Sequence, residues 1–451
     1  MRRVLIITYY WPPSGGSGVQ RWLKFAKYLP QYGWKPVIYT PLNPQANSCD
    51  EALLKDVSPS AEVIKRKIIE PYGLYKAITG KDSSKPIKAN IISNSENKSF
   101  LHKLSVFIRG NIFIPDPRCL WINPSVRYLK KYLKENPVDV IVSTGPPHSM
   151  HLIAKKLSKA TSVPWVADFR DPWTEIFYFK HLKLSSAAYK RHRMLEQSVL
   201  DNATAVTVVS NKMQRDFACR TATDIEVITN GFDTDDFPAY NTGKNIQKQE
   251  KEDGITRKFR IVHTGIFVEN GNPNVLWEVL GEKAAKDALF RENLEIRTMG
   301  QTDLSIISDI EKNSLSSSFI DMGYVAHNIA TLWQQRASLL LLPLRKEPEA
   351  AAILTGKFFE YLAAARPILA FGPTDGDLAK ALHECESGVI CEWEQKEAIR
   401  EVIDKAYDCY ISDTQVNALS YGKMPGVAAL KYSRKALTCK LADLLNRIIG
   451  R

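Results

Sequence analysis

The sequence predicts an α/β fold made of two Rossmann-like domains, each built on a parallel sheet. Short runs rich in Val, Ile and Leu alternate with amphipathic segments of helical period, which is the pattern of parallel strands covered by helices. This alternation stops once, in the polar segment 238–258, and then starts again. The chain has 451 residues, enough for two domains of roughly 200 residues each.

The domain boundaries follow from that interruption. We expect a first domain over 1–237, a linker over 238–258, and a second domain over 259–426. The linker is rich in Asn, Lys, Gln and Glu and has almost no large apolar residue. The last segment, 427–451, contains one predicted helix at about 427–448, which we expect to return to the first domain.

Charge and composition limit the class of partner. The net charge of +12 and the pI near 9.1 favour an anionic partner: nucleotide phosphates, nucleic acid or an acidic membrane. Net charge alone supports nucleic acid, and no nucleic-acid-binding motif accompanies it, so we do not expect that partner. Seven scattered cysteines without a CxxC motif predict neither a zinc site nor a disulfide framework, and they fit a reducing cytoplasm. No run reaches the roughly 18 apolar residues of a membrane span, so we expect a cytoplasmic protein, soluble or attached at the inner face of the plasma membrane.

The first domain opens with a strand at 4–7, a glycine-rich loop, a helix at 19–29 and a strand at 37–39. The loop is not a dinucleotide fingerprint, because Arg21 stands where the third glycine would be, and no Gly-Lys-Ser/Thr of a Walker loop follows. We interpret it as a loop that lets a ligand approach the backbone closely; a flexible turn is the alternative. Its candidate residues are Gly15, Gly16 and Ser17.

The segment 98–114 mixes basic and apolar residues and has two open interpretations. It could form an amphipathic helix on a membrane surface, or a helix packed on its own domain. The further elements expected in this domain are helices at 124–135, 149–159 and 184–200 and strands at 138–143, 164–167, 205–209 and 226–228.

Polar residues follow two of these strands directly, where parallel sheets bind their ligands. His148 ends the loop after 138–143, and three charged residues follow 164–167. We therefore expect a functional site at this edge, formed by His148, Asp168, Arg170 and Asp171. Two structural alternatives stay open: His148 could cap the helix that follows, and the three charges could form a local salt-bridge cluster.

The second domain repeats the alternation. We expect strands at 260–264, 294–299, 318–320, 339–342, 368–371 and 388–390 and helices beginning near 274, 327 and 375. Its most informative stretch is 354–373, which reads as a loop, a helix of about three turns and a buried strand. Unpaired amides and the positive end of the dipole make such a helix start an anion site. The residues at this start are Thr355, Gly356 and Lys357.

Lys357 and Glu360 lie three residues apart, on one face of that helix. The lysine could meet a diphosphate while the carboxylate accepts hydrogen bonds from sugar hydroxyls. The alternative is an ordinary surface ion pair between the two side chains.

Several phrases occur in an order that is specific taken together: the glycine loop at 15–18, STGPPHSMHLIA, ADFRDPW, VTVVS, VITNGFD, HTGIF, MGYVAH and TGKFFEYLAAARPILAFGP. In these phrases the chain resembles the retaining glycosyltransferases of family 4, in particular a subgroup with a DFRDPW-type motif, over nearly its whole length. The resemblance implies the GT-B fold: two Rossmann-like parallel-sheet domains that face each other across a cleft, with a C-terminal helix crossing back to the first domain.

The resemblance also implies roles for the candidate residues. In the second domain, Glu360 would hydrogen-bond the donor ribose, the residues of the helix start would lie near the diphosphate, and Gly265 would form the glycine turn after the first strand. In the first domain, the glycine loop around Gly16 would approach the donor phosphates and the acceptor. His148 and the cluster Asp168, Arg170 and Asp171 would face the acceptor.

The chain departs from the family pattern at two places. Ala352 stands where the family often has a first glutamate near the transferred sugar, a role left vacant or taken by Glu347 or Glu349. The Arg and Lys expected after the glycine turn are missing from HTGIFVENGNP, so Lys357 would supply part of the charge that holds the diphosphate.

The implied reaction moves a hexose or related sugar from a nucleoside diphosphate sugar to a hydroxyl of a saccharide or lipid-linked acceptor, with retention of configuration and without a metal or other cofactor. It would serve the synthesis of a cell-surface polysaccharide or glycolipid. Two alternatives remain at this point: a sugar-nucleotide epimerase of the same architecture, and a non-catalytic protein that binds a nucleotide sugar or a lipid.

Overall fold

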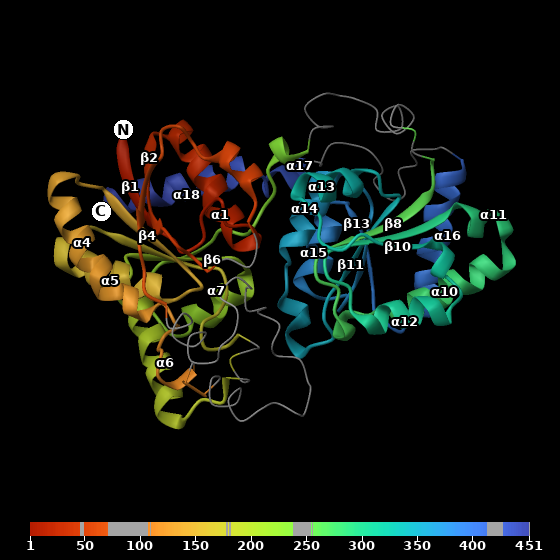
Figure 1. The fold of residues 1–451 in the computed structure, drawn as a ribbon, viewed down its shortest axis with the longest axis horizontal. Coiled ribbons are helices and arrows are strands. Elements are labelled where there is room, and N and C mark those ends of the chain that lie inside the picture. The colour runs from red at the N-terminus through yellow and green to blue at the C-terminus, as the bar shows by residue number, and fades with distance from the viewer. Residues whose placement is uncertain are drawn as a thin grey trace. The chain divides into compact units, whose positions relative to one another are not determined.

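The structure is a computed structural model of the chain. It describes residues 1–45, 49–70, 107–108, 110–176, 179, 182–237, 254, 256–412 and 427–450. The chain forms two compact units, one of Met1–Thr229 with Leu437–Arg451 and the other of Asn230–Ala436. Each unit has its own parallel sheet with helices on both faces (Figure 1).

The first unit contains a seven-stranded parallel sheet in the order β3-β2-β1-β4-β5-β6-β7. Its strand order reverses between β1 and β4, which pair from Val4 opposite Val140 to Ile7 opposite Ser143. The loops after these two strands therefore start at the position where open α/β sheets bind ligands. The strands are β1 (Arg2–Ile7), β2 (Trp34–Pro41), β3 (Glu62–Arg66), β4 (Val140–Gly145), β5 (Trp165–Phe169), β6 (Ala205–Val208) and β7 (Ile225–Val227).

Two hydrophobic clusters cover this sheet. One joins its strands to α1 and α18, through buried residues such as Trp22 of α1 and Leu441 of α18. The other joins them to the helices that follow β3 in the chain, through residues such as Leu129 and Ile153. The helices are α1 (Ser17–Tyr28), α4 (Ile122–Glu135), α5 (Ser149–Thr161), α6 (Ser186–Leu200), α7 (Asn211–Ala218) and α18 (Arg434–Ile449).

The C-terminal helix returns to the first unit, as the sequence predicts. Asn446 of α18 accepts hydrogen bonds from Arg2 Nη1 at 2.6 Å and from Trp34 Nε1 at 3.2 Å. In Figure 1, α18 lies among the elements of the N-terminal part of the chain. The segment is not the one helix over 427–448 that the sequence suggested, because α17 (Val427–Leu430) ends first and Ser433 pairs with Phe232 before α18 begins.

The second unit contains a six-stranded parallel sheet in the order β10-β9-β8-β11-β12-β13, with the reversal between β8 and β11. Its strands are β8 (Phe259–Thr264), β9 (Leu294–Met299), β10 (Phe319–Asp321), β11 (Leu339–Pro343), β12 (Ile368–Phe371) and β13 (Gly388–Cys391). Its helices are α10 (Asn274–Lys286), α11 (Ala288–Asn293), α12 (Leu304–Lys312), α13 (His327–Gln335), α14 (Gly356–Ala364), α15 (Asp377–Glu384) and α16 (Lys396–Ile411), besides α17.

Sequence patterns missed some elements and misplaced the ends of several strands, among them β2, β4 and β5. They gave no prediction for β3, α7, α11, α12 or α16, although Ile399, Ile403 and Ala406 of α16 have helical spacing and are buried. Strand β5 runs two residues beyond its predicted end, so Asp168 belongs to the strand and not to the loop after it. The predicted segment 98–114 lies mostly outside the described residues, as does the predicted linker, of which only 254 and 256–258 are described.

Ala365, the residue after α14, has φ 52° and ψ 42°, in the left-handed region. Glycine has no Cβ penalty there and is the usual residue at such helix ends. Ala365→Gly is therefore expected to raise the free energy of unfolding by about 0.5–1 kcal/mol, measured by urea denaturation. Ala398→Gly, inside α16, is the matched control and should lower it by about 1 kcal/mol. If Ala365→Gly destabilised the protein as much as the control, the conformational explanation would be wrong.

Candidate functional site

Asp168 carries the most heavily hydrogen-bonded carboxylate at the edge of the first sheet. Its side chain is 0% exposed, and its oxygens accept hydrogen bonds from Arg21, Trp22, Thr144 and Thr207 at 2.7–3.3 Å. Burial alone would raise the pKa of this carboxyl, but the Arg21 guanidinium and these donors lower it to about 2. With its acceptor sites used inside the unit, Asp168 joins α1 to three strands. This arrangement gives it a structural role.

The guanidinium of Arg170 also forms its hydrogen bonds within the first unit. Its guanidinium donates to the carbonyl oxygens of Gly18 at 2.9 Å, Gly145 at 3.3 Å and Pro146. Arg170 therefore joins the first turn of α1 to the loop after β4. The suggested local salt-bridge cluster is wrong in its pairing, because Asp168 pairs with Arg21 across the sheet edge.

His148 lies at the start of α5 and is only 6% exposed. It does not cap the helix, since its side chain makes no capping hydrogen bond; Asp116 accepts from the Ser149 amide instead, at 2.8 Å. The His148 ring stacks on Trp173, with 4.4 Å between ring centroids and 1° between planes. Burial, with the neighbouring His151 and Arg170, holds the pKa of His148 well below its usual value, so the ring is neutral near pH 7.

Asp171 differs from the other acidic residue of its motif. It is half-buried, and within the described part of the chain no group donates a hydrogen bond to its carboxylate. Burial raises the pKa of this carboxyl, although the adjacent Arg170 opposes the shift. Of the four residues predicted at this edge, His148 and Asp171 are therefore the two with unused polar atoms.

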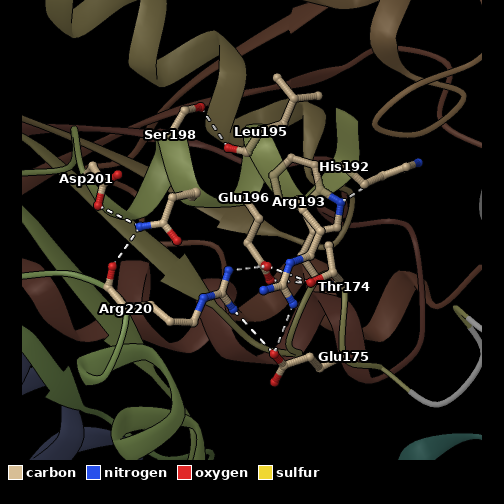
Figure 2. Close-up of polar contacts among 11 residues, drawn as sticks. Thr174, Glu175, His192, Arg193, Leu195, Glu196, Ser198, Asp201 and Arg220 are labelled. Atoms are coloured by element: carbon tan, nitrogen blue, oxygen red, sulfur yellow. Dashed lines mark hydrogen bonds and ion pairs between the residues drawn. The ribbon is translucent and has the colours of Figure 1, made fainter. Parts of the chain in front are cut away.

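Helix α6 holds the segment that follows Asp171. Glu196, fully buried, accepts from the Thr174 amide at 3.2 Å, the Thr174 hydroxyl at 2.7 Å and Arg220 Nη2 at 2.7 Å. Figure 2 shows Glu196 pointing from α6 towards Thr174 and Arg220. His192, one turn earlier, accepts from Trp173 Nε1 at 3.1 Å. The ring that stacks on His148 is thus fixed from α6.

The glycine loop of the first unit ends at Gly16, which precedes α1 with φ 95°. A Cβ there would meet no atom within 4 Å, so the backbone conformation, and not crowding, requires glycine. Gly15 is half-buried, and Ser17 is the first residue of α1. The loop follows β1, on the same edge of the sheet as the loops after β4 and β5.

In the second unit, the structure brings Gly265 and Lys357 together. Gly265 follows β8 with φ 111°, and a Cβ there would lie 2.0 Å from Lys357 Cε and 2.2 Å from Nζ. The lysine side chain therefore crosses the face of the glycine turn. Among the residues that the structure describes, no carboxylate pairs with Lys357, so the predicted alternative of an ion pair with Glu360 is wrong.

Three glycine turns interlock beside this lysine. The Gly265 amide donates to the Met299 carbonyl and the Gly300 amide to the Gly323 carbonyl, both at 2.6 Å. A Cβ on Gly300 would lie 2.2 Å from the carbonyl oxygen of Gly265. The turns after β8, β9 and β10 are therefore packed backbone against backbone, which leaves no room for a Cβ at Gly300.

Thr355 caps α14, since its hydroxyl accepts from the Phe358 amide at 3.4 Å. Gly356 is exposed, and a Cβ there would meet no atom within 4 Å. The first amides of this helix have no intrahelical partner by geometry. Lys357 projects from the same first turn, so cation and amides are presented together.

Glu360 accepts a hydrogen bond from Gln334 Nε2 at 3.4 Å, and the same nitrogen donates to Thr264 Oγ1 at 3.0 Å. This fixes the carboxylate over the end of β8. Behind it, the buried His263 donates from Nδ1 to the Leu341 carbonyl at 3.0 Å. Burial and Lys357 lower the pKa of His263 to about 3. A neutral His263 avoids repulsion with the lysine.

Of the two departures from the family pattern, the first concerns Ala352 and the nearby glutamates that could replace the family's first glutamate. Ala352 ends a short 3₁₀ helix, Pro348–Ala352. Glu347 accepts from Asn270 Nδ2 at 3.3 Å and lies 4.0 Å from Arg345 Nη1, so its carboxylate already has partners; the side chain of Glu349 is outside the described part.

Sequence reasoning missed the partners that make these sites. Arg21 was treated as a substituted glycine, although a buried Arg on α1 is the counter-ion of Asp168. Gln334 was not considered, and its polar side chain on the inner face of α13 was the available signal. Both act across long sequence separations, which pattern reading does not detect.

Comparison with protein-family models matches residues 87–236 to the model described as Glycosyltransferase Family 4. Most of the match falls in the first unit, and it includes the loops after β4 and β5; its last residues, 230–236, belong to the second unit. Comparison of the sequence with curated proteins finds no match.

Solved structures with the same architecture are similar over essentially the whole chain. Sucrose-phosphate synthase from Thermosynechococcus elongatus has a TM-score of 0.62 at 13% identity, with 100% of each chain covered. A glycosyltransferase from Rickettsia africae gives 0.61 at 16% identity, covering 100% of this chain and 99% of that one. HepE from Anabaena, solved in complex with UDP, gives 0.61 at 14%, covering 99% and 100%. Residues 87–236 thus match glycosyltransferase family 4, and the chain as a whole has the two-unit GT-B fold of glycosyltransferases.

Proposed function

We propose that this chain is a retaining glycosyltransferase of the subgroup with a DFRDPW-type motif. It moves a hexose or related sugar from a nucleoside diphosphate sugar to the hydroxyl of a saccharide or lipid-linked acceptor, in the synthesis of a cell-surface polysaccharide or glycolipid. The observation that supports this proposal most directly is the position of Lys357 in the first turn of α14. Its half-buried side chain crosses Gly265 and has no carboxylate partner among the described residues.

The chemistry of the donor supports this assignment. When the sugar leaves, negative charge develops on the diphosphate, and stabilising that charge is the main catalytic demand. Lys357 and the first amides of α14 supply positive charge from one place, and the interlocked glycine turns let the phosphates approach the backbone. The proposal assigns the compensating charge to these groups and not to a metal ion. HepE was also solved with UDP-glucose, a donor of this class.

Glu360 has the geometry for the donor ribose. The Glu360 carboxylate accepts one hydrogen bond, from Gln334 Nε2 at 3.4 Å, which holds it in place. Its remaining acceptor sites can bind sugar hydroxyls. In the first unit, we assign His148 and Asp171 to the acceptor, because no residue in the described part forms a hydrogen bond with either side chain. Front-face attack with retention needs little from a protein base, since the departing phosphate can take the acceptor proton.

A lipid-linked acceptor would place the protein at the inner face of an anionic plasma membrane, and one surface of the first unit fits that location. Asn111 donates to the Lys183 carbonyl and accepts from the Ser185 amide, so the chain at Asn111 lies beside the start of α6. Exposed apolar and basic side chains gather on these two segments: Phe107, Ile112, Tyr189, Lys190, Arg191 and Met194. In the described part of the chain no helix is both long and apolar enough to cross a bilayer.

A panel of nucleotide sugars tests the function. Incubation with each donor, with and without anionic vesicles carrying a membrane lipid extract, should give transfer of one sugar to an extracted acceptor. Conversion of a donor to its epimer without acceptor would favour the epimerase, and tight donor binding without turnover would favour a binding protein. Transfer absent for every donor would contradict the proposal.

Glu360→Ala should raise the Kd of the accepted donor roughly 10- to 100-fold, because a charged hydrogen-bond acceptor for the ribose is lost. Isothermal titration with the donor measures this. Glu401→Ala, on the exposed face of α16, is the control and should leave the Kd unchanged. Donor binding by Glu360→Ala equal to that of the unmodified chain would remove Glu360 from the site.

A further inference from the structure

Two buried imidazole nitrogens in the first unit face the same small space. Nδ1 of His148 and Nε2 of His151 have no hydrogen-bond partner in the part of the chain that the structure describes. A Cβ built on Gly145 would lie 3.0 Å from the first and 2.5 Å from the second. Buried polar atoms are nearly always satisfied, so this pair requires an explanation.

The direction of hydrogen bonding towards this space is fixed by Trp165. Its indole Nε1 can only donate, and it donates to Ser143 Oγ at 2.8 Å. Ser143 Oγ lies 2.8 Å from His151 Nδ1, and its single hydrogen has no other acceptor among the described residues. The hydroxyl therefore donates to His151 Nδ1.

That direction determines the tautomer of His151. Burial lowers the pKa of His151 to about 3, so its ring is neutral near pH 7. A neutral imidazole that accepts at Nδ1 carries its hydrogen on Nε2. His151 consequently directs an N–H group into the space beside Gly145, towards Nδ1 of His148.

We propose that His151 is a positioning residue that holds His148 in the tautomer with an acceptor at Nδ1 and a hydrogen on Nε2. No direct hydrogen bond joins the two nitrogens. In the proposed arrangement, one water molecule accepts from His151 Nε2–H and donates to His148 Nδ1. The chain of donors then runs one way, from Trp165 through Ser143 and His151 to His148.

The plane of the His148 ring is fixed independently. Trp173 stacks on it, and Trp173 Nε1 donates to His192 Nδ1, whose other nitrogen lies 3.4 Å from the Gly110 carbonyl. Tautomer and plane together make His148 present an N–H donor in one direction. A hydrogen bond from this N–H group to the acceptor substrate or to the transferred sugar rests on the proposed function. The tautomer of His148 does not.

Nitrogen-15 NMR of the full chain with labelled histidine tests the tautomer directly. Long-range ¹⁵N–¹H spectra should show His148 and His151 as neutral rings with the hydrogen on Nε2, assigned by loss of each signal in a substituted chain. In His151→Phe, the His148 signals should move towards a mixture of tautomers. In His151→Gln, whose amide N–H can replace the imidazole donor, they should return. The exposed His383→Gln is the control and should leave them unchanged.

Ser143→Ala keeps His151 in place and serves where His151→Phe fails to fold. Loss of the hydroxyl donor should shift His151 towards the other tautomer, and His148 with it. The proposal would be overturned by a hydrogen on Nδ1 of His148 in the unmodified protein. It would also be overturned if the His148 signals were the same in both variants as in the unmodified protein.

Kinetics separates positioning from packing. With the nucleotide sugar found in the panel, His151→Phe should lower kcat at least about tenfold and leave the KM for that sugar unchanged, because the wrong tautomer of His148 removes the N–H group that the reaction uses. His151→Gln should restore most of the lost kcat. Equal losses in both variants would mean a packing role and contradict the proposal. If the unmodified protein transfers no sugar, the proposed function fails while the NMR result still decides the tautomer.

Discussion

Lys357→Met should lower kcat/KM for sugar transfer roughly 100- to 1000-fold. Removing one preformed electrostatic donor to a developing negative charge has an effect of this size in other enzymes. The lysine has no carboxylate partner in the described part of the chain, so no ion pair there neutralises its charge and the lysine can bind the diphosphate. Steady-state kinetics with the identified donor measures the loss, and titration with the nucleoside diphosphate should show weaker binding.

The stability of Lys357→Met should not fall with its activity, which distinguishes a binding role of the lysine from a structural one. Lys357 pairs with no carboxylate in the described part of the chain, and the buried His263 beside it is already neutral near pH 7, so methionine removes no stabilising charge interaction. We therefore expect Lys357→Met to unfold at the same urea concentration as the unmodified chain, or at a higher one. Lys380→Met, on the exposed face of α15, is the control and should leave activity unchanged. Full activity in Lys357→Met would remove the observation that carries the proposed function.

The fold was predictable because its signals are local. Buried parallel strands such as β4 and β11 are short apolar runs, and helices such as α4 show their buried face at a spacing of three and four. The errors have local causes too. Asp168 was placed after β5 because a charged residue inside a buried strand is unexpected until Arg21 is known to pair with it. The C-terminal segment was read as one helix because its break is stabilised by pairing with the distant Phe232.

The sequence predicted where the candidate site residues lie in the fold, but not which partners their side chains have. Strand ends, glycine turns and a helix start located His148, Gly265 and Lys357, because each position follows from chain geometry. Sequence could not show which side chains are already in use. Arg170 and Asp171 are adjacent in the chain, yet three backbone carbonyls occupy the first while no described group donates to the second. Such differences arise from contacts far apart in sequence.

Asp168→Asn should destabilise the first unit by about 3–5 kcal/mol, the cost of leaving a buried charge without its partner. The carboxylate accepts from five donor groups of four residues. An asparagine offers one oxygen and turns an NH₂ group towards donors, so the Arg21 guanidinium loses its counter-ion in a fully buried place. Thermal unfolding followed by circular dichroism should show a midpoint lower by roughly 10 °C or more.

The acid response of the unmodified protein gives the same interaction an independent measurement. The pKa of Asp168 falls from 3.8 to about 2 in the folded chain, so its contribution is complete above pH 3.8 and is lost as the pH falls towards 2. Unfolding free energy should therefore drop less across this window in Asp168→Asn than in the unmodified chain. Glu175→Gln, which removes a half-exposed carboxylate with ion pairs of 3.5 and 3.7 Å to Arg220 and Arg193, should change stability by less than about 1 kcal/mol. A similar loss in both variants would mean that surface charge, and not the buried network around Asp168, holds α1 against the sheet.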